Sequence, residues 1–217
     1  MFFISAAPLS FKFSRRLRSV GTAVRSTAAN ISGAGGASAF IVFLSFLSGA
    51  VCGVFFHGLI PEGIYSSDWM SSIFEVYISA GNPGFEAYYY AFTFHAAVFF
   101  LCFSLFGVFL IPATVFFRGF TAAFSVSSVV GLYASRGAML AVSVFGAAAV
   151  FSIPGFLVLS VVSLSVSRRL FSAVVRGDAD RVFGAEYFLI SAACFAFAAL
   201  SALYRIYLLP GIVSNLL

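Results

Sequence analysis

Charged residues are scarce in this chain. Only 9% of its 217 residues are Asp, Glu, Lys or Arg, whereas 62% are hydrophobic. A soluble domain carries about 25% charged residues, and a chain with so few could not cover a surface exposed to water. The scarcity excludes an ordinary soluble protein and indicates that lipid forms part of the solvent.

Short segments of alternating polarity are also lacking. Backbone polar groups inside hydrocarbon must be paired within the protein, which leaves helices or a closed barrel. A barrel would show segments of about ten residues that alternate between apolar and polar, whereas the apolar runs here are continuous and longer. We therefore expect an all-α fold, a polytopic transmembrane helical bundle of about five spans with a cytoplasmic N-terminus.

Cysteine and histidine are few. Cys52, Cys102 and Cys194 lie in apolar runs, with no CxxC pattern and no His at metal-ligand spacing. This placement predicts small packing residues. His57 and His95 fall in different runs, among Phe and Ala, which is typical of satisfied helix histidines. We expect no metal site and no cofactor.

Motifs of catalysis are missing from the sequence as well. It contains no Gly-rich phosphate loop, no HExxH and no GxSxG. We therefore expect a protein that is not an enzyme. The net charge of +5 does not indicate a nucleic-acid partner, because the basic residues cluster at the ends of the apolar runs, where membrane proteins keep their topology signals. Membrane lipids are the expected partners.

The segment 1–36 is rich in Ser, Gly and Arg, and no acidic residue precedes Glu62. It predicts a basic cytoplasmic lead-in held at an anionic membrane surface. An organellar transit peptide has a similar composition and is the alternative; the lead-in is favoured.

Residues 37–217 form the expected membrane domain, with spans at about 37–59, 87–111, 114–133, 138–166 and 187–208. Gly49 and Gly53 make a GxxxG in the first span, which lets a second helix approach closely. We expect packing within the chain rather than a dedicated dimer face. The fourth span is expected to be interrupted, and kinked, at Pro154-Gly155.

The distribution of basic residues supports this layout. With the N-terminus inside, the lead-in, a turn at Arg118 and the loop 167–186 place ten basic residues in the cytoplasm, whereas Arg136 and Arg205 lie outside. This excess agrees with the positive-inside rule. The acidic stretch 60–86 would then face the outside.

Arg118 is the first candidate functional residue. A charge at membrane depth costs a few kcal/mol on insertion scales and is often functional. The favoured interpretation is a cytoplasmic anchor that, with Gly119, makes a tight turn between two spans. The functional alternative is a contact with a lipid phosphate, a partner or an internal acid. No acidic residue lies within an expected span, which argues against a proton relay.

The other candidate contacts lie at breaks or in loops. They are Pro154 and Gly155 in the fourth span, Arg168 and Arg169 in the loop 167–186, and Glu62, Asp68 and Glu75 in the outer acidic stretch.

Several segments from residue 88 onward resemble the stage II sporulation protein M family of bacterial membrane proteins. These are Gly107–Pro112 before Phe117–Phe120, Ile153–Phe156, Ser165–Leu170, and Leu209-Pro210 at the end of the last span. The number of spans, the chain length and the N-terminus-in layout are similar too.

This resemblance implies a non-enzymatic scaffold in the bacterial cytoplasmic membrane. Such a scaffold anchors peptidoglycan remodelling during sporulation engulfment, with stage II sporulation proteins D and P as partners. Two alternatives stay open. One is a permease-like subunit that works with a soluble ATPase through the loop 167–186, and the other is a subunit of an organellar membrane complex.

Overall fold

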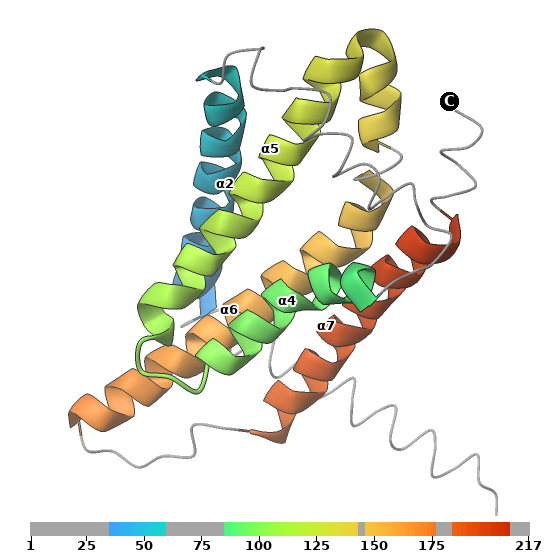
Figure 1. Cartoon of the computed structure of the whole chain (residues 1–217). Helices are drawn as coiled ribbons and strands as arrows, with labels where there is room; N and C mark the ends of the chain where they lie inside the picture. Colours follow the sequence, from blue (N-terminus) through green and yellow to red (C-terminus); the bar gives the residue numbers. More distant parts are fainter. Residues whose placement is uncertain (1–34, 60–84, 143–145, 177–183, 209–217) are drawn as a thin grey trace, which may run out of the picture.

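The computed structural model describes residues 35–59, 85–142, 146–176 and 184–208, and every regular element in these ranges is a helix. The helices are α2 (Gly36–Leu59), α4 (Phe85–Leu101), α5 (Gly107–Ala141), α6 (Ala147–Arg176) and α7 (Ala185–Leu203), and a π-helical turn, η4 (Tyr204–Leu208), extends α7 (Figure 1). The expected all-α helical bundle is confirmed.

Within these ranges, four helical segments are long and apolar enough to cross a membrane. They are Gly36–Leu59, Gly107–Gly131, Ala148–Val175 and Glu186–Tyr207. Helix α4 has 17 residues, or about 25 Å at 1.5 Å per residue, whereas the hydrocarbon core is about 30 Å thick. The structure therefore has four full-length candidate spans and one shorter helix where five spans were expected.

The helices form two groups. Helices α2 and α5 pack side by side along most of their length, and α4, α6 and α7 pack together beside them (Figure 1). The start of α2, the turn between α4 and α5, the end of α6 and the start of α7 lie towards one end of the bundle, the lower end in Figure 1. The chain therefore alternates in direction through all five helices, and η4 lies at the opposite end.

Glycines determine how closely α2 and α5 approach. A Cβ atom at Gly49 would overlap the carbonyl oxygen of Phe116, and one at Gly119 would overlap that of Phe46. Gly53 meets the backbone of Phe120 in the same way. Small residues allow such backbone contact between membrane helices, and the expected packing of the GxxxG within the chain is confirmed.

Aromatic rings and buried hydroxyls fill the α4–α6–α7 group. Phe156 and Leu159 of α6 are fully buried in its core. The ring of Phe92 stacks on that of Phe195, with centroids 6.1 Å apart, and Phe99 stacks on Tyr187 at 5.9 Å. This group is held by side chains, whereas the α2–α5 pair combines ring contacts, such as Phe56 with Phe120, with direct backbone contact at its glycines.

The chain reverses between α4 and α5 earlier than expected. We expected a second span to end at Pro112 and a turn at Arg118, but α4 ends at Leu101 and α5 runs without a break from Gly107 through both residues. The hydroxyl oxygen of Ser104 accepts a hydrogen bond from the amide of Phe106 at 3.2 Å, which stabilises the turn. Pro112 lies in the second turn of α5, where it removes only one helical hydrogen bond.

The fourth span also differs from the expectation of 138–166 with an interruption at Pro154. Residues 138–141 belong to α5, and α6 starts at Ala147, continues through Pro154 and ends at Arg176. Proline is tolerated within membrane helices because neighbouring groups satisfy the freed backbone. Arg168 and Arg169 consequently lie on a helix rather than in a loop.

Candidate functional site

Arg118 lies near the middle of a membrane-spanning helix. It is about eleven residues beyond Gly107, or roughly 16 Å along the helix axis, in a span that ends at Gly131. The interpretation of Arg118 as an anchor in a cytoplasmic turn is therefore wrong, and it does not belong in the count of cytoplasmic basic residues. A charge at this depth indicates a functional site by default.

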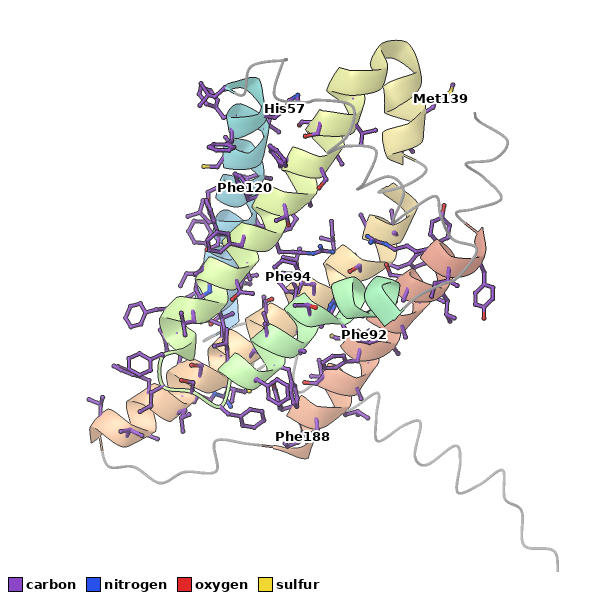
Figure 2. The ribbon with its side chains drawn as sticks, in the orientation of Figure 1. His57, Phe92, Phe94, Phe120, Met139 and Phe188 are labelled. Carbon is purple, nitrogen blue, oxygen red and sulfur yellow. The ribbon has the colours of Figure 1, made fainter. Side chains whose placement is uncertain are left out.

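The ring of Phe94 lies against the Arg118 guanidinium and is itself packed among further aromatic side chains. The Cζ atom of Arg118 lies 5.1 Å from the centroid of the Phe94 ring on α4, and Figure 2 shows Phe94 between α4 and the α2–α5 pair. The Phe94 ring contacts Phe156 edge-on at 6.3 Å. His95, fully buried, contacts the same Phe156 at 5.5 Å. We call Arg118, Phe94, His95 and Phe156 the Arg118 centre.

The chemistry of this centre follows from its two basic side chains. The face of an aromatic ring attracts a cation, more strongly when water is excluded, so Phe94 offsets part of the cost of placing Arg118 in the bundle. A guanidinium stays protonated and offers five donors. Arg118 can therefore bind an anionic group but does not shuttle protons, whereas the ring nitrogens of His95 can donate or accept a hydrogen bond.

Gly119, Pro154 and Gly155 are not part of this centre. Gly119 faces α2 and contacts the backbone of Phe46. Pro154 is exposed on the surface of α6. Gly155 is buried against α7, where a Cβ atom would lie 3.1 Å from that of Phe197. The two glycines are packing residues that face α2 and α7 rather than the Arg118 guanidinium.

Arg168 and Arg169 belong to a second polar region, at the end of the bundle where α2 begins. The Nη1 atom of Arg168 donates to the hydroxyl of Ser38 at 3.4 Å. The hydroxyl of Ser167 donates to the carbonyl oxygen of Ser104, in the α4–α5 turn, at 3.1 Å. Ser38 and Ser167 are fully buried, whereas both arginines are exposed. We call these five residues the Arg168 end.

The acidic candidates Glu62, Asp68 and Glu75 lie outside the described residues, so their expected role as partner contacts stays a prediction. In the ranges that the structure describes, no group of three or more His, Cys, Asp or Glu side chains could hold a metal ion.

Buried hydroxyls that link helices were not predicted from the sequence. Ser163 of α6 lies 3.3 Å from the hydroxyl of Tyr187 on α7, and Ser201 of α7 donates to the carbonyl oxygen of Ala148 on α6 at 3.0 Å. The spacing of Ser160, Ser163 and Ser167 places all three on one face of a helix. That spacing was the available signal, but serines are common throughout this sequence.

The fold and these two polar regions define the class of the protein: it is a polytopic α-helical membrane protein with an arginine at mid-depth. Comparisons with family models, with curated proteins and with solved structures find no match to this chain.

Proposed function

We propose that this chain is a non-enzymatic integral membrane scaffold that organises a peptidoglycan-remodelling complex in a bacterial cytoplasmic membrane. The observation that carries the proposal is the fixed packing of its helices. Backbone contact at Gly49, Gly53 and Gly119 holds α2 on α5, and buried hydrogen bonds join α6 to α7. A bundle built this way suits a platform that positions other proteins.

The peptidoglycan part of the proposal rests on the resemblance to the stage II sporulation protein M family. In that family the partners are wall hydrolases, stage II sporulation proteins D and P, which act outside the cytoplasmic membrane. The acidic residues Glu62, Asp68 and Glu75 follow α2 in the sequence, and a cytoplasmic N-terminus would put them outside. They are the proposed contact for these hydrolases.

Affinity purification from the native host in mild detergent, followed by mass spectrometry, tests the scaffold. We expect wild-type protein to recover wall hydrolases. The triple variant Glu62→Gln, Asp68→Asn, Glu75→Gln is expected to lose at least 90% of that signal, because it removes the proposed contact. The matched control is Arg205→Gln, which changes one charge elsewhere and should retain the hydrolases. Equal recovery with the triple variant would contradict the proposed contact.

A permease-like subunit that works with a soluble ATPase is the second candidate, and two observations favour it. Arg118 lies at mid-depth, where transporters bind substrate, and α6 continues through Arg168 and Arg169 to Arg176, which offers a helical coupling element. Recovery of an ATPase instead of hydrolases would support this candidate. Arg118→Gln should then abolish transport while Arg118→Lys retains part of it, because a charge at that depth is needed.

The proposed orientation has its own test. If α4 crosses the membrane despite its length, the chain passes five times, and a cytoplasmic N-terminus puts the C-terminus outside. A reporter fused after Leu217 should be active outside, and one inserted near Gly177 should be active inside. The reverse pair of results would overturn this layout. A third reporter at Met1 then separates the two causes, because it is active outside in an inverted chain and inside in a chain whose α4 does not cross.

A further inference from the structure

We propose that Arg168 and Arg169 bind the headgroup of an anionic phospholipid at the Arg168 end of the bundle. This contact goes beyond the proposed function and does not depend on whether the protein is a scaffold or a permease. Two arginines at consecutive positions of α6 are exposed here. Guanidinium and phosphate form paired, charge-assisted hydrogen bonds, which makes arginine well suited to a phosphodiester.

The depth of these arginines follows from their neighbours. The preceding residue, Ser167, bonds to Ser104 in the turn where the chain passes from α4 to α5. Arg168 itself bonds to Ser38, in the first turn of α2. Two helices therefore start, and one ends, at the level of Arg168. Since spanning helices end near the membrane boundary, the arginines lie where lipid phosphates lie.

The hydrogen bond to Ser38 also positions the charge. Ser38 is fully buried, so its hydroxyl is a fixed point on α2 to which the long side chain of Arg168 is tied. Tying the side chain down before binding reduces the rotamer freedom that a ligand must otherwise freeze. Arg169, the next residue on α6, supplies a second exposed cation at the same level of the helix.

Apolar residues beyond the arginines favour a lipid over a soluble acidic partner. Phe171 is 45% exposed, Val174 59% and Val175 67%, so the end of α6 is not a purely water-facing helix. Basic residues next to exposed apolar ones are typical of helix segments that lie at a membrane interface. These residues are typical of a helix end in the interfacial region of a membrane, where lipid phosphates are available to the arginines.

Charge complementarity extends to the attached segment of sequence. Residues 1–34 lead directly into α2 at this end and contain five basic residues and no acidic one. Such a net positive charge in the sequence favours anionic over neutral lipids.

Native mass spectrometry of the full chain in detergent tests the lipid contact, with phosphatidylglycerol and phosphatidylcholine added at equal concentrations. We expect wild-type protein to retain at least one phosphatidylglycerol in preference to phosphatidylcholine. The double variant Arg168→Gln, Arg169→Gln should bind phosphatidylglycerol about 30-fold more weakly. Equal retention of the two lipids by wild-type protein would overturn the proposal.

Three further samples test whether the site lies on α6 and whether it takes a lipid. Arg169→Gln leaves the contact between Arg168 and Ser38 in place, so its expected loss of about fivefold would not come from a disturbed α2. Arg205→Gln, at the opposite end of the bundle, should bind like wild type; an equal loss there would overturn the assignment to α6. Millimolar inorganic phosphate should not displace the lipid, and full displacement would show a site for free phosphate instead.

Discussion

The α2–α5 pair and the α4–α6–α7 group pack their helices in different ways. In the pair, glycines at Gly49, Gly53 and Gly119 bring the two backbones into direct contact. In the group, the helices are separated by rings and joined by hydroxyl groups, as between Ser163 and Tyr187. Lipid is as apolar as leucine, so neither interface gains a hydrophobic driving force, and both depend on close packing and hydrogen bonds.

The difference determines how each region should respond to mutation. Backbone atoms cannot move aside by changing a rotamer, so the pair should tolerate no added atom at its contact. Side chains leave a cavity when truncated, and a cavity is partly relieved by relaxation of its surroundings. The α4–α6–α7 group should therefore lose stability in graded steps.

The largest effect is expected for Gly49→Ala on α2. The added Cβ would overlap the backbone of Phe116, which should reduce the free energy of unfolding by about 3 kcal/mol. Reversible unfolding in mixed micelles measures the change. Gly58→Ala is the matched control on the same helix, because nothing lies within 4 Å of its Cβ position, and a similar loss in both variants would contradict backbone contact as the cause.

Phe156→Ala should have the next largest effect, about 2 kcal/mol, because in lipid a truncation loses the cavity contribution but little hydrophobic transfer energy. The ring is fully buried and contacts Phe94 and His95, so truncation leaves a cavity beside the Arg118 centre. The same unfolding assay measures this loss. Phe55, 71% exposed on α2, is the control, and Phe55→Ala should change stability little. A larger effect at Phe55 would show that this surface of α2 is covered in the native assembly.

Removal of one hydroxyl by Tyr187→Phe should cost about 1 kcal/mol. The Tyr187 hydroxyl lies near that of Ser163, and the ring is almost fully buried, so the variant removes a hydrogen bond and keeps the stacking on Phe99. Tyr207→Phe, where the side chain is 74% exposed, is the matched control. Equal unfolding midpoints for the two variants would show that this hydrogen bond contributes nothing measurable.

The smallest effect, about 0.6 kcal/mol, is expected for Ser167→Ala, which removes the bond from α6 to the carbonyl oxygen of Ser104. Ser48→Ala serves as its control, because the Ser48 hydroxyl bonds within its own helix, to Ser45 at 3.0 Å. A loss in Ser48→Ala as large as in Ser167→Ala would remove the distinction between bonds within and between helices.

Sequence reasoning predicted the features that depend on composition and on local spacing. The long apolar run that became α2 and the GxxxG within it were both visible, because each depends on consecutive residues or on a period of four. The predictions at Pro112 and Pro154 were wrong: both prolines were expected to end or interrupt helices, and both lie inside one. A membrane offers the backbone no water to bond instead, so helices continue through proline more often than in soluble proteins.

The position of Arg118 shows the same limit more sharply. In a sequence, a basic residue followed by glycine is typical of a turn. The chain instead reverses about ten residues earlier, in a turn around Ser104 that contains no proline, and α5 starts there. That shift changed Arg118 from a surface anchor to a charge at mid-depth over Phe94. The position of such a turn depends on how the side chains of the two helices pack against their neighbours.

By itself, the sequence determined that this protein is a bundle of membrane helices, because too few charges remain to cover a soluble surface and hydrocarbon requires paired backbone groups. Only the tertiary structure decided which helices touch and where the two arginine regions lie. The contact of Gly119 with Phe46, and that of Arg168 with Ser38, join residues far apart in the chain. Such contacts depend on how whole helices pack, which no local pattern encodes.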